Sequence, residues 1–543
     1  MKRIYILLTV MLCLNMMSQA QDPANYPPDV TTVKIDSTNL PIVWISVDGA
    51  TISRNDRIGA RMKIIHNGKG RLNYADTVAH PGQTIDYEGF IALRYRGNSS
   101  YSMSDKKPYS FRTLSQPYDM GYDKKKVSIL GMGKDNNWAL LAPYSDKSMI
   151  RDLLGFEIAR PWMEYTPQGR LCEVYLDGTY YGVYILCEVV SQGKHRLNLD
   201  DPGNDGDALT GGYLMEVDRN EGMYYVSKHH PVNSKGVPYE DRYIVFQYEW
   251  PDYEDLTLEQ INYINGRIDE MEEAFASPDY ADPNKGYSKY IDVQSFMDYQ
   301  IVQEVSHNVD AYRLSAKFYK QRDSIDPRFK MVVWDLNLAF GNARHSQGYR
   351  TDTWVYWINS VLYPNDEHMV PFWWYKLRCN DAYIKARWAR WAEWRQNNLR
   401  SDRIMATIDS LASEVTACGA MERNSVAWPR WGKYVWPNYY ISKSYDDEIN
   451  YLKEWLTTRI AWLDKQWKYE EPPLPPPPPD PFPLGDVNGD WQVNIADINM
   501  LIDIILSDTD DEELLARADV NGDGEVKVSD VSFLITLVLT SDN

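Results

Sequence analysis

Residues 304–342 contain EVSHNVDAYRLSAKFYK, a short polar turn, and FKMVVWDLNLAFGN. The first run is typical of a helix that ends in a polar loop carrying Asn308 and Asp310, and the apolar segment MVVW delivers Asp335 at its end. Sites are often built where a rigid strand meets a loop that reaches a ligand. Two such carboxylates suit phosphoryl transfer, in which one orients or deprotonates the acceptor hydroxyl and the other holds the metal on the phosphates. A buried Asp at a strand end is equally well interpreted as a structural cap.

The chain has 543 residues, which is too long for one core, so we expect two or three domains. Residues 1–20 have the pattern of a secretory signal peptide: Lys2 and Arg3, the apolar core ILLTVMLCL, and the small-residue site SQA before Gln21. No later run approaches the roughly 18 apolar residues of a membrane span. We therefore expect a soluble, secreted protein, whether extracellular, at the cell surface or periplasmic.

The net charge limits the partners that the chain can bind, and the cysteine positions limit its possible disulfides and metal sites. A net charge of -20 argues against nucleic acid as a main partner. Cys172 and Cys187 flank the predicted hairpin EVYLDGTYYGVYIL, so a disulfide between them is possible in an oxidising compartment. Two buried free thiols are an equally good interpretation, and the cysteine spacings suit no zinc site.

The stretch FIALRYRGNSSYSMSDKKPYSFRTL predicts a strand, a polar loop and a second strand. The loop holds Arg96, Asn98 and Ser99 around a glycine, with Lys106 and Lys107 on its far side. Small hydroxyl residues next to a glycine can offer backbone N–H groups to phosphate oxygens, and a following lysine can neutralise the charge. Taken alone, such a loop is more often a simple hairpin turn.

The next stretch, SDKSMIRDLLGFEIAR, predicts a helix that begins near Lys147 and is capped by Ser145 or Asp146. Arg151 stands beside the apolar face, where a surface salt bridge is the simplest interpretation. Further along, Trp388, Trp391 and Trp394 recur at three-residue spacing. Such a stripe favours core packing over a carbohydrate platform.

Residues 470–484, EEPPLPPPPPDPFPL, predict a semi-rigid polyproline II linker. Beyond it, GDVNGDWQVNIADINMLIDIIL and ADVNGDGEVKVSDVSFLITLVL form a repeat, and an apolar helix follows each loop. Oxygen-bearing side chains at loop positions one, three, five and twelve match a calcium site, with one backbone carbonyl per loop. The predicted ligands of the two Ca²⁺ ions are Asp486, Asn488, Asp490, Gln492 and Asp497, then Asp519, Asn521, Asp523, Glu525 and Asp530.

Both loops end in Asp, whereas an EF-hand loop usually ends in Glu. With the short paired format, residues 485–543 therefore resemble a type I dockerin, a small all-α domain. The resemblance implies calcium-dependent binding to a cohesin module, which attaches secreted proteins, mostly carbohydrate-active enzymes, to a scaffold.

The larger part of the chain, residues 21–469 with a core at about 40–467, resembles the CotH family. The resemblance rests on RGNSS…KKPYSF, SDKSMIRD, EVYLDGTYYGVYILCE, GGYLMEVD, NVDAY and WDLNLAFGN in that order. It implies an α+β chain with an atypical protein-kinase-like domain that phosphorylates protein Ser/Thr with ATP and Mg²⁺ or Mn²⁺.

Carried onto this chain, the resemblance makes Asp310 the catalytic residue and Asp335, with Asn337, the ligands of the metal. It implies that the nucleotide is bound by Arg96, Asn98, Ser99, Lys106, Lys107, Arg151 and Glu188, with Glu188 as the partner of the phosphate-binding lysine. Two departures stand out. Asn337 replaces the second Asp of the family's WDxD, and Ser315 stands where a kinase catalytic loop has Asn.

Three functions remain open from the sequence. The first is a secreted CotH-like kinase docked to a complex. The second is a catalytically silent CotH-like structural or adhesive module. The third is a component of polysaccharide degradation, although we identify no glycosidase motif.

Overall fold

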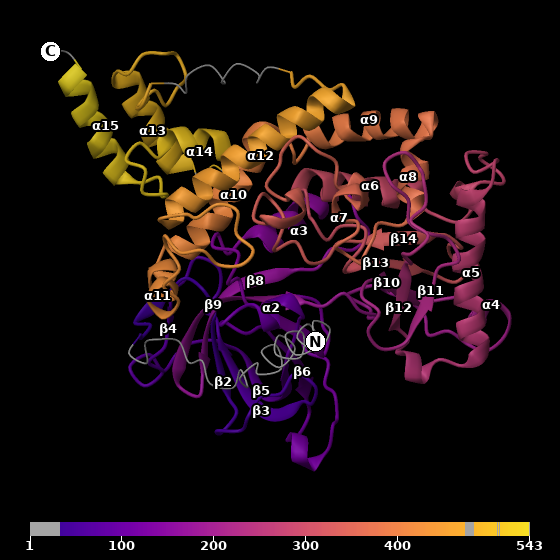
Figure 1. The fold of residues 1–543 in the computed structure, drawn as a ribbon. Helices are drawn as coiled ribbons and strands as arrows, with labels where there is room; N and C mark the ends of the chain where they lie inside the picture. Colours follow the sequence, from indigo (N-terminus) through magenta and orange to yellow (C-terminus); the bar gives the residue numbers. More distant parts are fainter. Residues whose placement is uncertain (1–32, 473–482, 508, 510, 542–543) are drawn as a thin grey trace. The chain divides into compact units, whose positions relative to one another are not determined.

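The computed structural model describes residues 33–472, 483–507, 509 and 511–541 (Figure 1). The predicted signal peptide and most of the predicted linker lie outside these residues. The chain divides into two compact units, one ending at Glu470 and the other beginning at Glu471, and each is described by itself. The mixture of helices and strands confirms the predicted α+β class.

A closed barrel of seven strands forms the first half of the larger unit. In barrel order these are β2 (Ile42–Ser46), β3 (Ile58–Ile65), β5 (Ile85–Tyr95), β6 (Tyr109–Leu114), β7 (Asn137–Leu141), β9 (Thr179–Glu188) and β8 (Gly169–Leu176). The parallel pair β2–β8 closes the barrel. Every strand contributes to one hydrophobic cluster, through Val43, Met62, Leu93, Phe111, Leu140, Val174 and Leu186. Because strand residues alternate in direction, the neighbours of these residues face away from the barrel interior.

The β8–β9 hairpin turns at Asp177 and Gly178, both with positive φ, as a two-residue hairpin turn requires. Its register pairs Cys172 with Tyr184 and Cys187 with Gly169, so the two cysteines do not oppose each other. Both are buried free thiols. A disulfide between them is therefore wrong, and the alternative of two buried thiols is confirmed.

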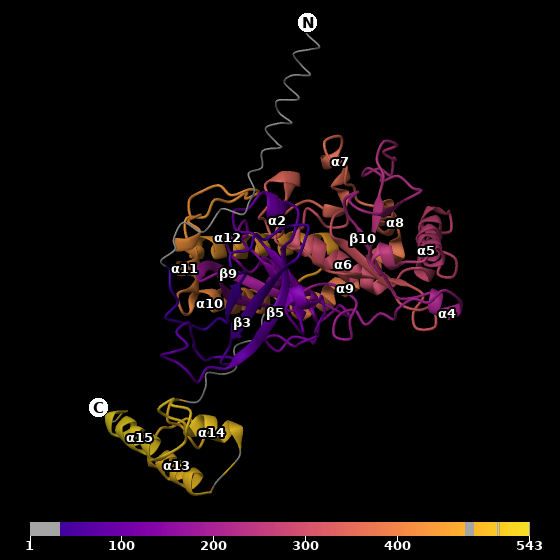
Figure 2. The same ribbon diagram turned by 90° about the horizontal axis from the view of Figure 1, so that it is seen from below.

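A five-stranded antiparallel sheet lies beside the barrel, and helix α5 (Leu258–Ala276) runs along its far side (Figures 1 and 2). The strand order is β11 (Tyr224–Val226), β12 (Val245–Trp250), β10 (Tyr213–Val217), β13 (Ala316–Lys320) and β14 (Phe329–Val332). Strand β10 falls within the motif GGYLMEVD. The sheet joins segments that are far apart in sequence, because β10 pairs with β13.

Helices complete the unit. They include α3 (Arg151–Ala159), α6 (Val293–Ser306), α8 (Phe372–Arg378), α9 (Asp381–Gln396), α10 (Ser401–Thr416), α11 (Ala420–Ala427) and α12 (Tyr445–Trp467). Of these, α6 packs against strand β14 of this sheet, and α11 packs against strand β9 of the barrel. Within α9, Trp391 and Trp394 are fully buried; the Trp391 indole donates to Asp464 at 2.8 Å, and Trp394 stacks on Trp162. The prediction that this stripe packs in the core is confirmed.

Helix α3 begins at Arg151, four residues later than predicted. Residues 146–149 form a turn instead, because the Asp146 carboxylate accepts the N–H groups of Ser148 and Arg151 at 3.1 and 2.9 Å. The N-cap is therefore Ile150, not Ser145 or Asp146, although the Asp146 carboxylate still accepts the first helical N–H.

In the smaller unit, the helices are α13 (Ile495–Ser507), α14 (Glu512–Ala518) and α15 (Val528–Ser541). A small core of Val487, Leu501, Ile504, Ala518, Val520 and Leu534 holds them together. Within the described ranges, no helix of either unit is both long and apolar enough to cross a membrane.

Candidate functional site

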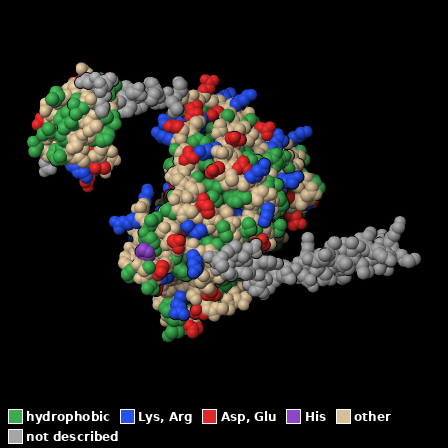
Figure 3. Space-filling view, turned by 90° about the vertical axis from the view of Figure 1, so that its left-hand side faces the viewer, with side chains coloured by type: hydrophobic (Ala, Val, Ile, Leu, Met, Phe, Trp, Pro, Cys, Tyr) green, Lys and Arg blue, Asp and Glu red, His purple; other side chains and the backbone are tan. Residues whose placement is uncertain are grey.

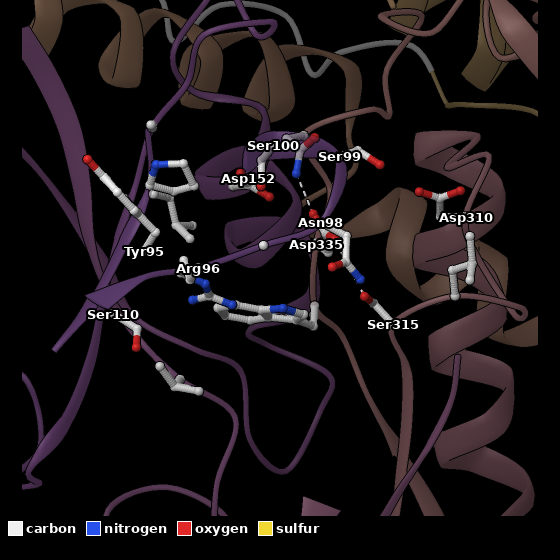
Figure 4. A pocket seen from close by; sticks show the side chains of 18 of the residues that line it. Tyr95, Arg96, Asn98, Ser99, Ser100, Ser110, Asp152, Asp310, Ser315 and Asp335 are labelled. Atoms are coloured by element: carbon white, nitrogen blue, oxygen red, sulfur yellow. Dashed lines mark hydrogen bonds between the residues drawn. The ribbon is translucent and has the colours of Figure 1, made fainter. Parts of the chain in front are cut away.

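A cavity of about 870 Å³ is lined on one side by the barrel and on the other by the five-stranded sheet. Asp310, Asp335 and Asn337 line it together with the segment from Arg96 to Ser100 (Figure 4). Segments more than 200 residues apart in the chain therefore meet in one space.

Asp310 lies in the loop that follows α6. That helix ends when His307 adopts a left-handed conformation, with φ 46°. The Asn308 side chain then connects the two acidic segments, because its oxygen accepts the N–H of Asp310 at 3.2 Å and its amide donates to the Asp335 carbonyl at 3.1 Å. Arg313 forms an ion pair with Asp310 at 3.1 Å, which holds the carboxylate at the cavity.

Asp335 directly follows the apolar strand segment and also has a left-handed conformation, with φ 58°. A non-glycine residue in this region is strained and is often functional. Its carboxylate accepts the Ser315 hydroxyl at 3.5 Å and the Asn337 amide. Burial, followed by repulsion from the Asp310 carboxylate, raises the pKa of Asp335 to about 6, while Arg96 opposes the shift.

Asp152 on α3 is a third carboxylate at the cavity, and the sequence did not single it out. It accepts the N–H of Leu336 at 2.7 Å, next to Asp335. Burial, followed by repulsion from Asp335, raises its pKa to about 8. The motif SDKSMIRD contains Asp152, but only the three-dimensional contact with Leu336 reveals its place.

The oxygen atoms of Asp335 and Asn337 suit a hard divalent cation. Burial, followed by repulsion between carboxylates, raises the pKa values of Asp335 and Asp152, so a bound cation would stabilise their ionised forms. These residues therefore fit Mg²⁺ or Mn²⁺.

The predicted phosphate loop lines the same cavity as these carboxylates. Gly97 has φ 81°, and a Cβ there would lie 2.1 Å from the Ser100 hydroxyl oxygen, so the turn requires glycine. Helix α2 (Ser99–Ser102) begins after Asn98. The Arg96 guanidinium lies over the Trp334 ring at 5.1 Å, and its buried Nη1 makes no hydrogen bond.

The structure does not bring the two predicted lysines to the cavity. The Lys106 ammonium donates to the Val183 carbonyl and to Asn424 inside the protein. The Lys107 ammonium donates to the carbonyls of Tyr101 and Ser104 at 2.7 and 2.6 Å. Lys106 is thus held between strand β9 and helix α11, and Lys107 is held by carbonyl oxygens at the end of helix α2.

Glu188 also has a different partner from the one predicted. Its carboxylate forms a fully buried ion pair with Arg196 at 2.6 Å. The predicted pair between Glu188 and Lys107 is therefore wrong. Arg196 follows the β8–β9 hairpin in the sequence, so its ion pair with Glu188 depends on the tertiary structure.

Arg151 is neither at the surface nor at the cavity. Its guanidinium is completely buried between Asp146 and Glu448, at 2.6 and 2.7 Å. The expected surface salt bridge is wrong, and the contact with phosphate has no support because both carboxylates already neutralise this arginine. Glu448 belongs to α12, nearly 300 residues away, so the sequence could not indicate the pair.

The sheet contributes further cavity residues that the sequence analysis missed. Lys317 on β13 bridges Glu216 on β10 and Glu249 on β12, at 2.7 and 2.8 Å. Burial opposes the charge of Lys317, but the two carboxylates outweigh it and raise its pKa. In the sequence, Glu216 and Asp218 alternate within an otherwise apolar strand. This pattern could have indicated that they line a site.

The smaller unit contains the two predicted calcium loops. The Asp486 carboxylate accepts the N–H groups of Gly489 and Trp491 at 2.8 and 2.7 Å, which curls the first loop around its oxygens. In the second loop, Asp519, Asp523 and Asp530 bring carboxylate oxygens within 4.8 Å of one another. This all-oxygen set fits Ca²⁺.

Comparison with protein families gives two matches. A model described as CotH kinase protein matches residues 93–463, and a model described as dockerin type I domain matches residues 484–539. No curated protein matches the chain. The dockerin match implies Ca²⁺ binding and a cohesin partner for the smaller unit.

Proposed function

Because the chain belongs to the CotH kinase protein family, we propose that its larger unit transfers a phosphoryl group from ATP to Ser or Thr of a protein. The observation that carries this proposal is the meeting of Asp310, Asp335 and the Gly97 turn in one cavity. The barrel and the five-stranded sheet then act as the two lobes of an atypical kinase-like fold, with the site between them.

In this proposal Asp310 receives the proton of the acceptor hydroxyl. The acceptor oxygen bonds to the γ-phosphorus while the bond from that phosphorus to the β,γ-bridging oxygen breaks, and ADP leaves. Asp335 and Asn337 would hold Mg²⁺ or Mn²⁺, which supplies charge neutralisation at the phosphates when bound. Arg96 supports the same role, because its partly unpaired guanidinium faces the cavity.

The smaller unit anchors the enzyme in this proposal. Its calcium loops would bind a cohesin module on a scaffold outside the cell, and residues 1–20 would direct export. The substrate would then be another secreted protein or another member of the same scaffold.

One observation favours a catalytically silent module instead. Asn337 lacks the second carboxylate of the family's motif, and the Asn337 amide and the Ser315 hydroxyl both occupy the Asp335 carboxylate. The missing carboxylate and these two hydrogen bonds leave less negative charge available to bind a metal ion. A domain of this kind would serve as a structural or adhesive part of the complex.

Transfer from labelled ATP to the protein itself and to casein, with Mn²⁺ or Mg²⁺, tests the proposal. We expect incorporation that falls at least 100-fold in Asp310→Asn and Asp335→Asn, since general base and phosphate stabilisation each contribute factors of about 10² or more. Asp241→Asn, which changes an exposed aspartate paired with Arg242, is the matched control and should keep full activity.

Absence of incorporation, together with no ATP-dependent rise in the melting temperature of folded protein, would reject the kinase proposal in favour of the silent module. Activity that survives in Asp335→Asn would reject the assignment of the metal site.

A further inference from the structure

The barrel side of the cavity is strongly basic. Between residues 54 and 137, the cavity lining includes no Asp or Glu but five arginines: Arg54, Arg57, Arg94, Arg96 and Arg112. The opposite side carries two cations, Arg219 and Lys317, and six carboxylates: Glu216, Asp218, Glu221, Glu249, Asp310 and Asp335. The face of the molecule in Figure 3 instead intersperses acidic and basic side chains. The cavity therefore separates charges that the surface mixes.

The strand register gathers three of these arginines into one cluster, Arg57–Arg94–Arg112. Leu93 and Phe111 point into the barrel, so Arg94 and Arg112, which alternate with them, point outward. Arg94 pairs with Ser110, and Arg57 precedes the pair formed by Ile58 and Leu93. The three guanidinium groups thus lie around Ser110 on the cavity side of the barrel.

Within the described ranges, no carboxylate forms an ion pair with any arginine of the cluster. Arg57 donates to the carbonyls of Ala92 and Ser110 at 3.0 and 3.1 Å and to the Ser110 hydroxyl at 3.0 Å. Arg94 donates to the carbonyl of Asn55 at 3.4 Å. These partners are neutral, although the chain carries 77 acidic against 57 basic side chains.

The charges around the cluster are unfavourable without a ligand. Burial, followed by repulsion from Arg94 and Arg112, lowers the pKa of Arg57 to about 10. Tyr118 and Tyr122 interact electrostatically with Arg57, and the Asp252 carboxylate interacts electrostatically with Arg112. A ligand with negative charge would relieve this repulsion.

We infer that the Arg57–Arg94–Arg112 cluster binds Asp or Glu side chains of the acceptor segment, so that the substrates are acidic around the phosphorylated Ser or Thr. The inference rests on the proposed kinase function and specifies its substrate class. The planar guanidinium fork matches a carboxylate in two hydrogen bonds.

The position of the cluster and the volume of the cavity favour the acceptor, and not the nucleotide, as the ligand of this cluster. The nucleotide phosphates are assigned to the Gly97 turn and Arg96. Arg94 lies two residues back along the strand, a separation of about 7 Å, and Arg112 follows beyond it. A cavity of about 870 Å³ is near the upper end of the roughly 300–1,000 Å³ that one small ligand occupies, so an acceptor side chain has space beside a nucleotide.

Binding of fluorescent peptides to the full chain, without ATP, tests the inference separately from catalysis. Three peptides of equal length would carry one Ser flanked by Glu, by Gln or by Lys. We expect the Glu peptide to bind about tenfold or more tightly than the Gln peptide, and this preference to weaken at high salt. The same order should appear in the KM values for phosphorylation.

Arg94→Gln and Arg112→Gln should each reduce the preference for Glu several-fold and leave the affinity for ATP unchanged. Arg61→Gln is the matched control, since Arg61 is an exposed barrel arginine outside this cavity and should keep the preference. These variants spare Arg57, whose hydrogen bonds support the barrel.

Equal binding of the Glu and Gln peptides overturns the inference, and this comparison needs only wild-type protein. A preference that persists in both variants, or a loss of ATP affinity without a loss of the preference, overturns it as well. If the Glu peptide binds as expected but no phosphate is transferred, the kinase proposal fails while the acidic-peptide site stands.

Discussion

At the scale of single residues, buried charges separate the structural arginines from those of the site. Arg151, predicted as a phosphate contact, is enclosed by Asp146 and Glu448, whereas Arg96 lies over the Trp334 ring and forms no ion pair with a described residue. Both are arginines in a distinctive motif, so the residue type alone does not distinguish them. What distinguishes them is whether a carboxylate already neutralises the charge.

Arg151→Met should therefore reduce stability strongly. The change leaves two buried carboxylates without their cation, and breaking such a pair costs about 3–5 kcal/mol. Denaturant unfolding of the larger unit measures the loss. Arg350→Met is the control, because Arg350 pairs with Asp352 at the exposed surface and should cost under about 1 kcal/mol. An equal effect of the two changes would contradict the structural role of Arg151.

The raised pKa of Asp152 predicts a pH dependence of stability. The folded state holds this proton up to about pH 8, whereas the unfolded chain releases it near the ordinary value of 3.8. The contribution to stability is therefore complete below about pH 4 and is lost as the pH rises through about 8. Asp335, with a pKa of about 6, acts in the same direction.

Asp152→Asn should flatten this decline, because the amide stays neutral and its oxygen can still accept the Leu336 N–H. We expect melting temperatures at pH 8 to rise by a few degrees over wild type, with little difference at pH 4. Asp241→Asn serves as the exposed control. A wild-type melting curve that does not change between pH 5 and 8 would refute the assignment.

At the scale of elements, local sequence patterns predicted the strands, the hairpin at Asp177 and the tryptophan helix well. Each of these depends on periodicity or turn chemistry within a few residues. The cavity residues Asp310 and Asp335 were also predictable, since each follows an apolar run. Pairings between distant elements could not be predicted, because strand register and burial arise only when the sheet and the barrel assemble. The partners of Glu188 and Lys317 are examples.

The contact between α3 and the Asp335 segment offers a test at this scale. A Cβ on Gly155 would lie 2.1 Å from a Leu336 methyl carbon, so Gly155→Ala must displace the residue next to Asp335. We expect a loss of about 1–3 kcal/mol from overpacking and a marked fall in phosphotransfer.

Gly266→Ala is the matched control in helix α5, where the added methyl meets no atom within 4 Å. This change should be neutral or should stabilise the protein by up to about 1 kcal/mol. Phosphotransfer by Gly155→Ala that equals that of the control would mean that α3 does not position Asp335.

At the scale of the whole molecule, the two units obtain their stability from different sources. The larger unit has an extensive apolar core shared by the sheet and helices, and a second core inside the barrel. The smaller unit has a core of only six fully buried side chains among the described residues. It also gathers acidic oxygens that repel one another without a cation. We therefore expect its folding, but not that of the larger unit, to depend on Ca²⁺.

Calorimetry with Ca²⁺ and then with EGTA should show two transitions, of which only the one from the smaller unit moves. A ligand at 100 times its Kd stabilises a fold by about 2.7 kcal/mol per site, so chelation should lower this transition clearly and abolish binding to a cohesin module. Asp519→Ala and Asp530→Ala should reproduce the effect in the presence of Ca²⁺, because each removes a carboxylate from the second loop. Asp503→Asn, on the exposed side of α13, is the control and should respond to Ca²⁺ like wild type. If chelation shifted both transitions or neither, the division between a larger unit that folds without Ca²⁺ and a smaller unit that needs Ca²⁺ to fold would be wrong.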